Sequence, residues 1–432
     1  MNQSENRGTL FPVLSEATRR CPEDLVESQT ANRVAGGMQV ALLTGGGDKP
    51  YALGLASALM DQKIRTDFVG SDEVDSPDLH KSEYIRFLNL RGDQSPCMSL
   101  IKKATRLLIY YWRLFVYATN ADPVIFHILW HNKFEFFDRI VLMGFYKALG
   151  KKIVFTAHNI NAGQRDGNDS WSNRLSLKCQ YHYADKVFVH TELMKKELAG
   201  DFSVPESRIS VIPFGINNTL SRTGLTGAEA RSKLGIPSKD KTVLFFGNIA
   251  PYKGLEYLVR AMAAVIAKDP DCRLVIAGRP KGCEEYWRAI QDEIFRLGID
   301  DNVLTCIKYI PDDGVEIYFK AADVLVLPYL QIFQSGVLFL GYSFGLPVIA
   351  SDVGSMRDDI IPGETGFVCK PMDAGDLGRV IEKYFKSGMF AQLGSRREAI
   401  REFANKQYSW DTVGHITAKV YEELMGAPKN KV

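Results

Sequence analysis

Short apolar runs alternate with helix-length segments along almost the whole chain. In the first half, these runs are MQVALLT (38–44), TDFVG (66–70), PVIFHILW (123–130), KKIVFTA (151–157), DKVFVHT (185–191) and ISVIPFG (209–215). Apolar runs of this length are typical of parallel strands whose two faces are both covered by helices. The pattern therefore predicts an α/β fold built on doubly wound parallel sheets.

The same pattern restarts after a polar stretch. The later runs are TVLFFGN (242–248), RLVIAGR (273–279), NVLTCIK (302–308), DVLVLPY (323–329), PVIASD (347–352) and TGFVCK (365–370). A chain of 432 residues is also too long for one ordinary core. We therefore predict Rossmann-like domains at residues 38–217 and 218–405 that face a central cleft. The linker would lie at about 218–240, and residues 406–432 would form a helix that packs back toward the first domain.

Composition excludes several classes of protein. The formal net charge is +2, which is too close to balance to indicate a nucleic-acid partner. Residues 1–37 are polar and lack the apolar core of a signal peptide, so we expect a flexible tail and a cytoplasmic location. The seven cysteines include no CxxC pair, which favours a reduced chain without a zinc site.

One segment, residues 99–118, has the pattern of a basic amphipathic helix. It combines Lys102, Lys103, Arg106 and Arg113 with aliphatic and aromatic residues at helical spacing. Such a helix can lie on an anionic membrane surface, which would suit a lipid-linked acceptor. The alternative is a helix packed into the first domain. The apolar part is too short and too charged to span a membrane, so we expect at most a peripheral contact at the inner face.

A corner of small residues joins a strand to a helix in the segment 332–355. The corner consists of Gln334, Ser335 and Gly336, and an apolar run follows it. The N-terminus of a helix presents backbone N–H groups and a partial positive charge, which can bind a phosphate. Ser335 could instead be an ordinary N-cap of a core helix. Both interpretations stay open on this segment alone.

A lysine follows the first strand of the second half. In FFGNIAPYKG (245–254), the strand ends at Gly247 and the next loop carries Lys253. A lysine ammonium at a strand end can reach a diphosphate, although a lysine in a loop is more often solvated. Lys253 and the Gln-Ser-Gly corner both follow strands of one domain. Together they favour a diphosphate site.

These motifs resemble the family 4 retaining glycosyltransferases, which have the GT-B architecture of two Rossmann-like domains. The resemblance runs from Met38 to about Met425 and rests on TGGG (44–47), FTAHN (155–159), VIPFGIN (211–217), FGNIAPYKG (246–254), the LPY to GLPVIASDVGS block (327–355), GETGFV (363–368) and YSWDTVGHITAKVYEEL (408–424). It implies a hexosyltransferase that uses a UDP- or GDP-linked sugar and retains the anomeric configuration. The resemblance further implies no cofactor and no essential metal. The acceptor would be a glycan or a lipid-linked molecule, and surface polysaccharide synthesis would be the setting.

The resemblance also assigns roles to individual residues. The loop over the donor phosphates would be formed by Gly45, Gly46 and Gly47. His158 would lie beside the transferred sugar, and Lys253 would contact the diphosphate, which makes these two the predicted catalytic residues. The donor-binding residues of the second domain would be Asn248, Lys253, Arg279, Tyr309, Ile310, Gln334, Ser335, Gly336 and Val337. His131 also follows a strand, and it could line the acceptor side or be an ordinary structural histidine.

The chain departs from the family pattern at the corner and at one strand end. The family commonly has two glutamates eight residues apart, whose positions are taken here by Ile332 and Leu340, and Gln334 could bind the sugar instead. Where the family often has an arginine, this chain has Asn248, and Arg279 could supply that charge. We interpret the chain as an active variant with a Gln-Ser-Gly corner. The alternatives are a catalytically weakened nucleotide-binding scaffold and a nucleotide-sugar epimerase, which the missing acids disfavour.

Overall fold

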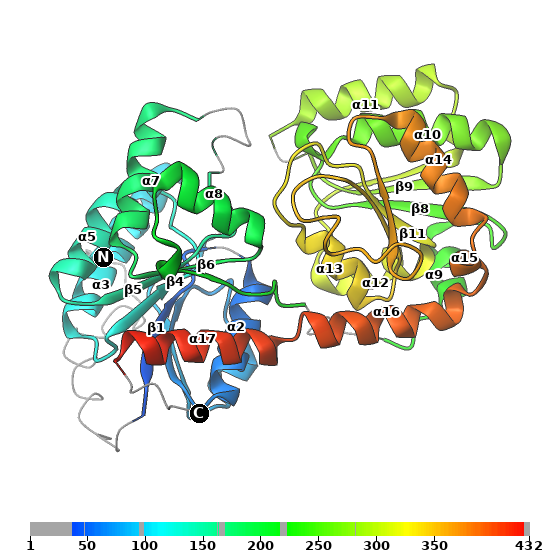
Figure 1. The fold of residues 1–432 in the computed structure, drawn as a ribbon. Helices are drawn as coiled ribbons and strands as arrows, with labels where there is room; N and C mark the ends of the chain where they lie inside the picture. Colours follow the sequence, from blue (N-terminus) through cyan, green and yellow to red (C-terminus); the bar gives the residue numbers. More distant parts are fainter. Residues whose placement is uncertain are drawn as a thin grey trace, which may run out of the picture. The chain divides into compact units, whose positions relative to one another are not determined.

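The computed structural model describes residues 37–46, 48–94, 99–161, 163, 169–216, 223–280 and 282–426. Gly47, the predicted tail up to residue 36, residue 217 at the end of the predicted first domain and residues 218–222 of the predicted linker lie outside them. The described residues form two parallel sheets, each with helices packed on it (Figure 1). The predicted α/β class with two doubly wound sheets is therefore confirmed.

The first sheet has the order β3-β2-β1-β4-β5-β6-β7, and all neighbouring strands are parallel. Its strands are β1 (Gln39–Leu43), β2 (Arg65–Gly70), β3 (Ile85–Asn89), β4 (Ile125–Ile128), β5 (Lys152–Thr156), β6 (Lys186–Val189) and β7 (Ile209–Val211). The edge strand β3 is partly exposed and carries Arg86. It therefore lacks the continuous apolar run from which the other strands are predicted.

Helices cover both faces of this sheet because its strands bury both sets of alternating side chains. Ala41 and Leu43 of β1 join a core cluster with residues of the helices α3, α5, α7 and α8. The helices of this part of the chain are α2 (Lys49–Asp61), α3 (Leu100–Asn120), α4 (Glu135–Phe137), α5 (Met143–Ala148), α7 (Trp171–Tyr183) and α8 (Glu192–Phe202), with the 3-10 turns η2 (Pro77–His80) and η4 (Glu206–Arg208) and the π-helical turn η3 (Asp138–Leu142).

The last helix, α17 (Trp410–Leu424), packs against α2 on the other face. Gly414 permits a close approach, because an added Cβ there would lie 2.9 Å from the carbonyl oxygen of Ala58. The hydroxyl of Tyr421 lies 2.6 Å from Nδ1 of His127, a buried residue of β4. Side chains from the end of the chain thus complete the core around the first sheet.

The second sheet has the order β10-β9-β8-β11-β12-β13 and is also fully parallel. Its strands are β8 (Lys241–Phe246), β9 (Cys272–Gly278), β10 (Val303–Ile307), β11 (Val324–Leu327), β12 (Val348–Ser351) and β13 (Gly366–Cys369). The strand order reverses between β8 and β11, so the connections after these two neighbours lead in opposite directions. Ligands of open α/β sheets bind at such a switch point, at the carboxyl ends of the strands.

The strands of the second sheet also bury both faces. Leu244 and Phe246 face one core cluster, whereas Val243 and Phe245 face another. The helices are α9 (Gly227–Leu234), α10 (Leu255–Lys268), α11 (Glu284–Arg296), α12 (Asp312–Ala321), α13 (Gly336–Ser343), α14 (Ala374–Phe385), α15 (Gly388–Ala391) and α16 (Leu393–Gln407), with the 3-10 turns η5 (Pro251–Lys253) and η6 (Asp300–Asn302). The helix α9 lies inside the predicted linker, where a Thr226–Glu229 capping box begins it.

Candidate active site

The turn after β8 brings Lys253 back to the carboxyl end of the second sheet. Gly247 has a φ of 104°, and a Cβ added to it would lie 3.1 Å from Nζ of Lys253. The ammonium also lies 5.0 Å from the centroid of the Tyr329 ring, which follows β11. Lys253 is only 6% exposed. Its charge is therefore held at the strand ends and is not that of a solvated loop lysine.

The helix α13 begins at Gly336, directly after the loop that follows β11. Ser335 is its N-cap residue, but the Ser335 side chain makes no capping hydrogen bond. Val337 in the first turn lies 3.5 Å from the Cβ position built on Gly247. The first turn of α13 and Lys253 therefore meet at Gly247, on the two sides of the switch point between β8 and β11. The backbone N–H groups and the ammonium both present positive charge there.

Gln334 is tied to a buried carboxylate that no sequence pattern indicates. Its Nε2 donates to Oδ2 of Asp359 at 3.3 Å, and the Tyr408 hydroxyl donates to Oδ1 at 3.0 Å. Burial raises the pKa of Asp359 to about 6. The bond from Nε2 orients the amide, and Oε1 of Gln334 is a buried acceptor without a hydrogen-bond partner among the described residues. In the sequence, Asp358 and Asp359 look like two acids of a surface turn. In the structure, Asp358 is exposed and only Asp359 is buried.

Ile332 and Leu340, which take the place of the usual glutamates, pack against the core of the second sheet. The backbone of the corner is also held closely, because a Cβ on Gly354 would lie 1.9 Å from the carbonyl oxygen of Ile332. Apolar side chains at these positions stabilise the corner by packing and offer no hydrogen bond. The polar side chains of this corner are those of Gln334 and Ser335.

Arg279 and Tyr309 pair at the ends of β9 and β10. The guanidinium carbon of Arg279 lies 5.0 Å from the centroid of the Tyr309 ring. Tyr309 is 62% exposed, so its ring can accept a stacked base. Asn248 is exposed beside Gly247, whereas Ile310 packs against the core. Of these four predicted donor-binding residues, the structure directly joins only Arg279 and Tyr309.

In the first sheet, the glycine loop after β1 is pressed between two other segments. A Cβ on Gly45 would lie 2.1 Å from the carbonyl oxygen of Trp130, and one on Gly46 would lie 2.4 Å from Nη1 of Arg91. Both glycines have positive φ values, 66° and 143°. Arg91 donates a hydrogen bond to the carbonyl oxygen of Gly45. Only glycine fits this path, which runs along the switch point between β1 and β4.

His158 follows β5 and lies beside the same switch point. Its ring stacks on Trp130 with a centroid distance of 4.3 Å and an interplanar angle of 4°, and the edge contact with Tyr51 is 4.6 Å. Nδ1 of His158 lies 3.0 Å from Nε2 of His190, the residue after β6. Burial lowers the pKa of His158 well below its ordinary value and lowers the pKa of His190 to about 4. Both imidazoles are therefore neutral at pH 7.

His131 follows β4 but turns into the body of its domain. Its Nε2 lies 2.7 Å from Oε1 of Gln180, and its ring stacks on Phe155 at a centroid distance of 5.2 Å. Burial lowers the pKa of His131 to about 3. These contacts are typical of a structural histidine, and the acceptor-side role stays a prediction.

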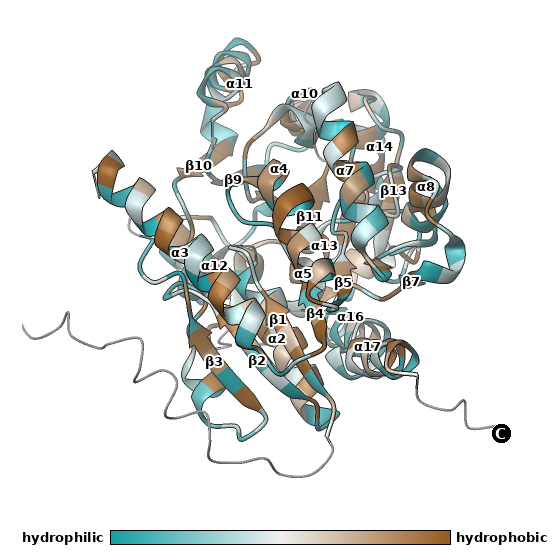
Figure 2. Cartoon of the chain, turned by 90° about the vertical axis from the view of Figure 1, so that its left-hand side faces the viewer, coloured by the Kyte–Doolittle hydropathy of each residue, from teal (hydrophilic) through white to brown (hydrophobic). Residues whose placement is uncertain are grey.

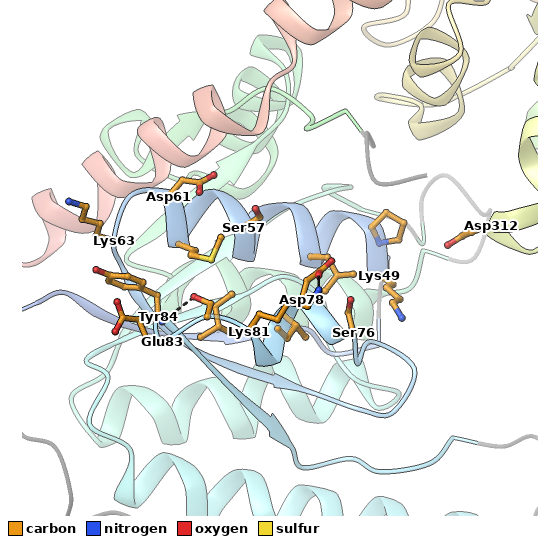
Figure 3. Close-up of a pocket in the computed structure, with 16 residues that line it drawn as sticks. Lys49, Ser57, Asp61, Lys63, Ser76, Asp78, Lys81, Glu83, Tyr84 and Asp312 are labelled. Atoms are coloured by element: carbon orange, nitrogen blue, oxygen red, sulfur yellow. Dashed lines mark hydrogen bonds and ion pairs between the residues drawn. The ribbon is translucent and has the colours of Figure 1, made fainter. Parts of the chain in front are cut away.

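A pocket of 1030 Å³ lies elsewhere on the first domain, beside α2, η2 and the beginning of β3 (Figure 3). Two of its lysines are bonded within the chain: Lys49 donates to the carbonyl oxygen of Asp75 at 2.8 Å, and Lys81 donates to Asp78 at 2.8 Å. None of the predicted catalytic or donor-binding residues lines this pocket. The residues predicted for the reaction therefore lie at the two switch points and not in this pocket.

Solved structures identify the fold. Sucrose-phosphate synthase from Thermosynechococcus elongatus matches with a TM-score of 0.70 and 21% identity over 90% of this chain and 100% of that chain. Anabaena HepE in complex with UDP-glucose matches with a TM-score of 0.69 and 15% identity over 89% of this chain and 100% of that chain. At these identities the likeness shows the fold alone. It confirms the predicted GT-B architecture.

Sequence comparisons add the family. The model of Glycosyltransferase Family 4 matches residues 45–220, and that of Glycosyl transferases group 1 matches residues 227–407. A D-inositol 3-phosphate glycosyltransferase of Corynebacterium glutamicum (strain R) is 26% identical over 75% of this chain and 79% of that protein. The D-inositol 3-phosphate glycosyltransferase of Streptomyces avermitilis is 29% identical over 58% of this chain and 54% of that protein. This match therefore spans about half the length of the Streptomyces protein. The chain is a glycosyltransferase of the GT-B type that combines a family 4 domain with a group 1 domain.

Proposed function

We propose that the chain transfers a hexose from a UDP- or GDP-linked donor to a glycan or lipid-linked acceptor, with retention of anomeric configuration and without a metal ion. The observation that carries this proposal is the meeting of Lys253 with the first turn of α13 at Gly247. Positive charge from both elements suits a diphosphate. The related Anabaena HepE structures are complexes with UDP and with UDP-glucose, which supports a nucleotide-sugar donor.

The proposed roles follow the charges that develop in the reaction. Cleavage between the sugar and the diphosphate leaves negative charge on the phosphate, which Lys253 and the N–H groups of α13 would stabilise. Gln334 and His158 each hold a buried acceptor atom that could orient sugar hydroxyls. The donor phosphate would take the proton of the acceptor hydroxyl on the face that the leaving group occupied, and the configuration would be retained.

Calorimetric titration of the full chain with UDP and with GDP, in EDTA, tests the proposal. Micromolar binding of one nucleotide would support it and select the donor class. Proton NMR of the product formed from the matching sugar nucleotide then reads the anomeric configuration. An inverted product, or activity that EDTA abolishes, would contradict the proposed stereochemistry or metal independence. Binding of neither nucleotide would favour the weakened scaffold.

Replacing His158 with alanine is expected to lower kcat by about 100-fold, the size typical of losing a positioned polar group in the transition state. The affinity for the nucleoside diphosphate is expected to change less than about 3-fold, because His158 would contact the sugar and not the diphosphate. His158→Phe is the matched variant, since it keeps a ring to stack on Trp130. Equal losses of turnover and nucleotide affinity would remove His158 from the sugar site.

A lipid-linked acceptor draws support from α3. Ile101, Leu108 and Trp112 are 80%, 71% and 68% exposed and follow each other at helical spacing, so they form one outward stripe. Figure 2 shows apolar segments in brown along α3 and in α4. At helical spacing, Lys102, Arg106 and Arg113 lie along one side of the stripe, and basic residues beside an apolar stripe favour a helix lying on an anionic surface.

The opposite face of α3 is packed into the first domain. Tyr110, Leu114 and Ala118 are buried in the core cluster of the first sheet. The buried face agrees with the alternative of a helix packed into the first domain, and the proposed membrane contact would use the opposite, exposed face. Among the helices that the structure describes, none is long and apolar enough to cross a bilayer. We place the contact at the membrane surface, where surface polysaccharide synthesis would present a lipid-linked acceptor.

The double variant Leu108→Glu/Trp112→Glu is expected to reduce flotation with vesicles containing phosphatidylglycerol by at least ~10-fold, because burial of each large apolar side chain is worth about 1.5–3 kcal/mol. Trp171→Glu is the control, since Trp171 is 79% exposed on α7, away from the stripe. Flotation assays of the wild type and both variants measure this. A wild-type chain that stays unbound, or a double variant that still floats, would contradict the membrane contact.

A further inference from the structure

A chain of polar atoms at neighbouring strand ends leads to His158. Nδ1 of His190 lies 3.3 Å from the carbonyl oxygen of Ile212, and Nε2 of His190 lies 3.0 Å from Nδ1 of His158. Nε2 of His158 is buried and has no hydrogen-bond partner among the residues that the structure describes. The contacts therefore run from the end of β7, past the end of β6, to the end of β5.

The chemistry of the three groups determines where each proton lies. A carbonyl oxygen only accepts, so Nδ1 of His190 must carry the hydrogen of their shared bond. A neutral imidazole has one N–H group, so Nε2 of His190 accepts, and Nδ1 of His158 must donate to it. Burial keeps both rings neutral by lowering their pKa values. Nε2 of His158 is therefore left with a lone pair.

Packing holds Ile212, His190 and His158 at these positions. The backbone N–H of Ile212 donates to the carbonyl oxygen of Val189 at 2.9 Å, which ties the end of β7 to the end of β6. His190 is 5% exposed. The stack on Trp130 and the edge contact with Tyr51 fix the plane of the His158 ring. A flip of either ring would exchange nitrogen for carbon and break the contact between Nε2 of His190 and Nδ1 of His158.

We propose that His190 is a positioning residue that holds His158 as the Nδ1–H tautomer, so that Nε2 of His158 accepts a hydrogen bond from a hydroxyl of the transferred sugar. The part that concerns the sugar rests on the proposed function, whereas the tautomer follows from this chain alone. A buried acceptor without a partner is destabilising, and a sugar hydroxyl supplies the hydrogen it lacks. The opposite tautomer would present an N–H donor at the same place.

Nitrogen-15 chemical shifts of the imidazole nitrogens read the tautomer in the full chain labelled at histidine. The chain has seven histidines, and the signals of His158 are assigned by their loss in His158→Gln. We expect a protonated Nδ1 and an unprotonated Nε2 in the wild type. His190→Phe keeps a ring but removes the acceptor, and it is expected to shift His158 to the Nε2–H tautomer. His190→Gln keeps an acceptor oxygen and is expected to preserve the wild-type signals.

A wild-type His158 that carries its proton on Nε2 would overturn the proposal without any variant. An unchanged His158 tautomer in His190→Phe would overturn the role of His190. Because the wild-type spectrum is decisive on its own, the proposal stays testable even if His190→Phe fails to fold.

The proposed hydrogen bond between His158 and the sugar is tested by measuring kcat of the wild type and the His190 variants. The substrate is the sugar nucleotide that the calorimetric titration selects. His190→Phe is expected to lower kcat by at least ~10-fold and to change the Kd of the nucleoside diphosphate less than ~2-fold, with most of kcat recovered in His190→Gln. Unchanged kcat in a variant with the switched tautomer would overturn the role toward the sugar. A wild-type chain that binds no nucleotide would contradict the proposed function, while the spectra would still decide the tautomer.

Discussion

Replacing Lys253 with methionine is expected to weaken nucleoside diphosphate binding by at least ~100-fold, which corresponds to a loss of about 3 kcal/mol. Lys253 is 6% exposed, and its ammonium lies near Gly247, close to Val337 of the first turn of α13. A charged hydrogen bond in such a place is stronger than one in water. Methionine keeps an unbranched side chain and removes the ammonium that lies over the Tyr329 ring.

The same variant is expected to lose much less stability than nucleotide affinity, because methionine keeps an unbranched side chain in the place of the buried lysine stem. Calorimetric titration with the preferred nucleotide and a thermal melt measure the two effects separately. Lys233→Met is the control, because Lys233 is exposed on α9. Unchanged binding in Lys253→Met would remove Lys253 from the site, and a large fall in melting temperature would assign it to the fold.

Gly278→Ala is expected to destabilise the second domain by more than about 4 kcal/mol, a size that point substitutions rarely reach. The added Cβ would lie 1.8 Å from the carbonyl oxygen of Gly247, and Gly278 has a φ of 151°. The clash meets backbone and cannot be relieved by a rotamer change. Gly247 is also anchored, because its N–H donates to the carbonyl oxygen of Ala277 at 2.9 Å.

Denaturant unfolding and soluble yield measure this effect. Gly282→Ala is the matched control: its φ is also positive, at 74°, but an added Cβ would meet nothing within 4 Å. The control should cost only about 1–2 kcal/mol, the strain of a left-handed conformation. Because Gly278 supports Gly247, any folded Gly278→Ala protein should also bind the nucleotide more weakly. A variant with wild-type stability and affinity would contradict the close approach of the two glycines.

Sequence patterns predicted the strands and helices well, because the burial of a strand and the start of a helix depend on residues that are close together in the chain. Strands buried on both faces require continuous apolar runs, so twelve of the thirteen described strands, all but β3, coincide with runs identified on that ground. The edge strand β3 needs no such run and carries Arg86. The polar stretch at 218–240 read as a linker, yet tertiary packing stabilises α9 within it.

The candidate site was predictable only in part. The Gln-Ser-Gly corner and Lys253 are visible in the sequence because each directly follows a strand of one sheet. Asp359 gave no signal, since no local pattern separates it from a surface acid. His190 follows a predicted strand, as His131 and His158 do, but nothing along the sequence indicates that it contacts His158. Each becomes important through one contact, to Gln334 at 3.3 Å and to His158 at 3.0 Å.

The sequence alone therefore determined the two parallel sheets and the strand ends that could carry chemistry, because burial and helix starts depend on neighbours along the chain. The tertiary structure decided which strand ends meet. The order β10-β9-β8-β11 places Lys253 beside α13, and the order β1-β4-β5-β6 places His158 between Trp130 and His190. Strand order and side-chain direction are long-range outcomes of packing, which no local pattern of residues contains.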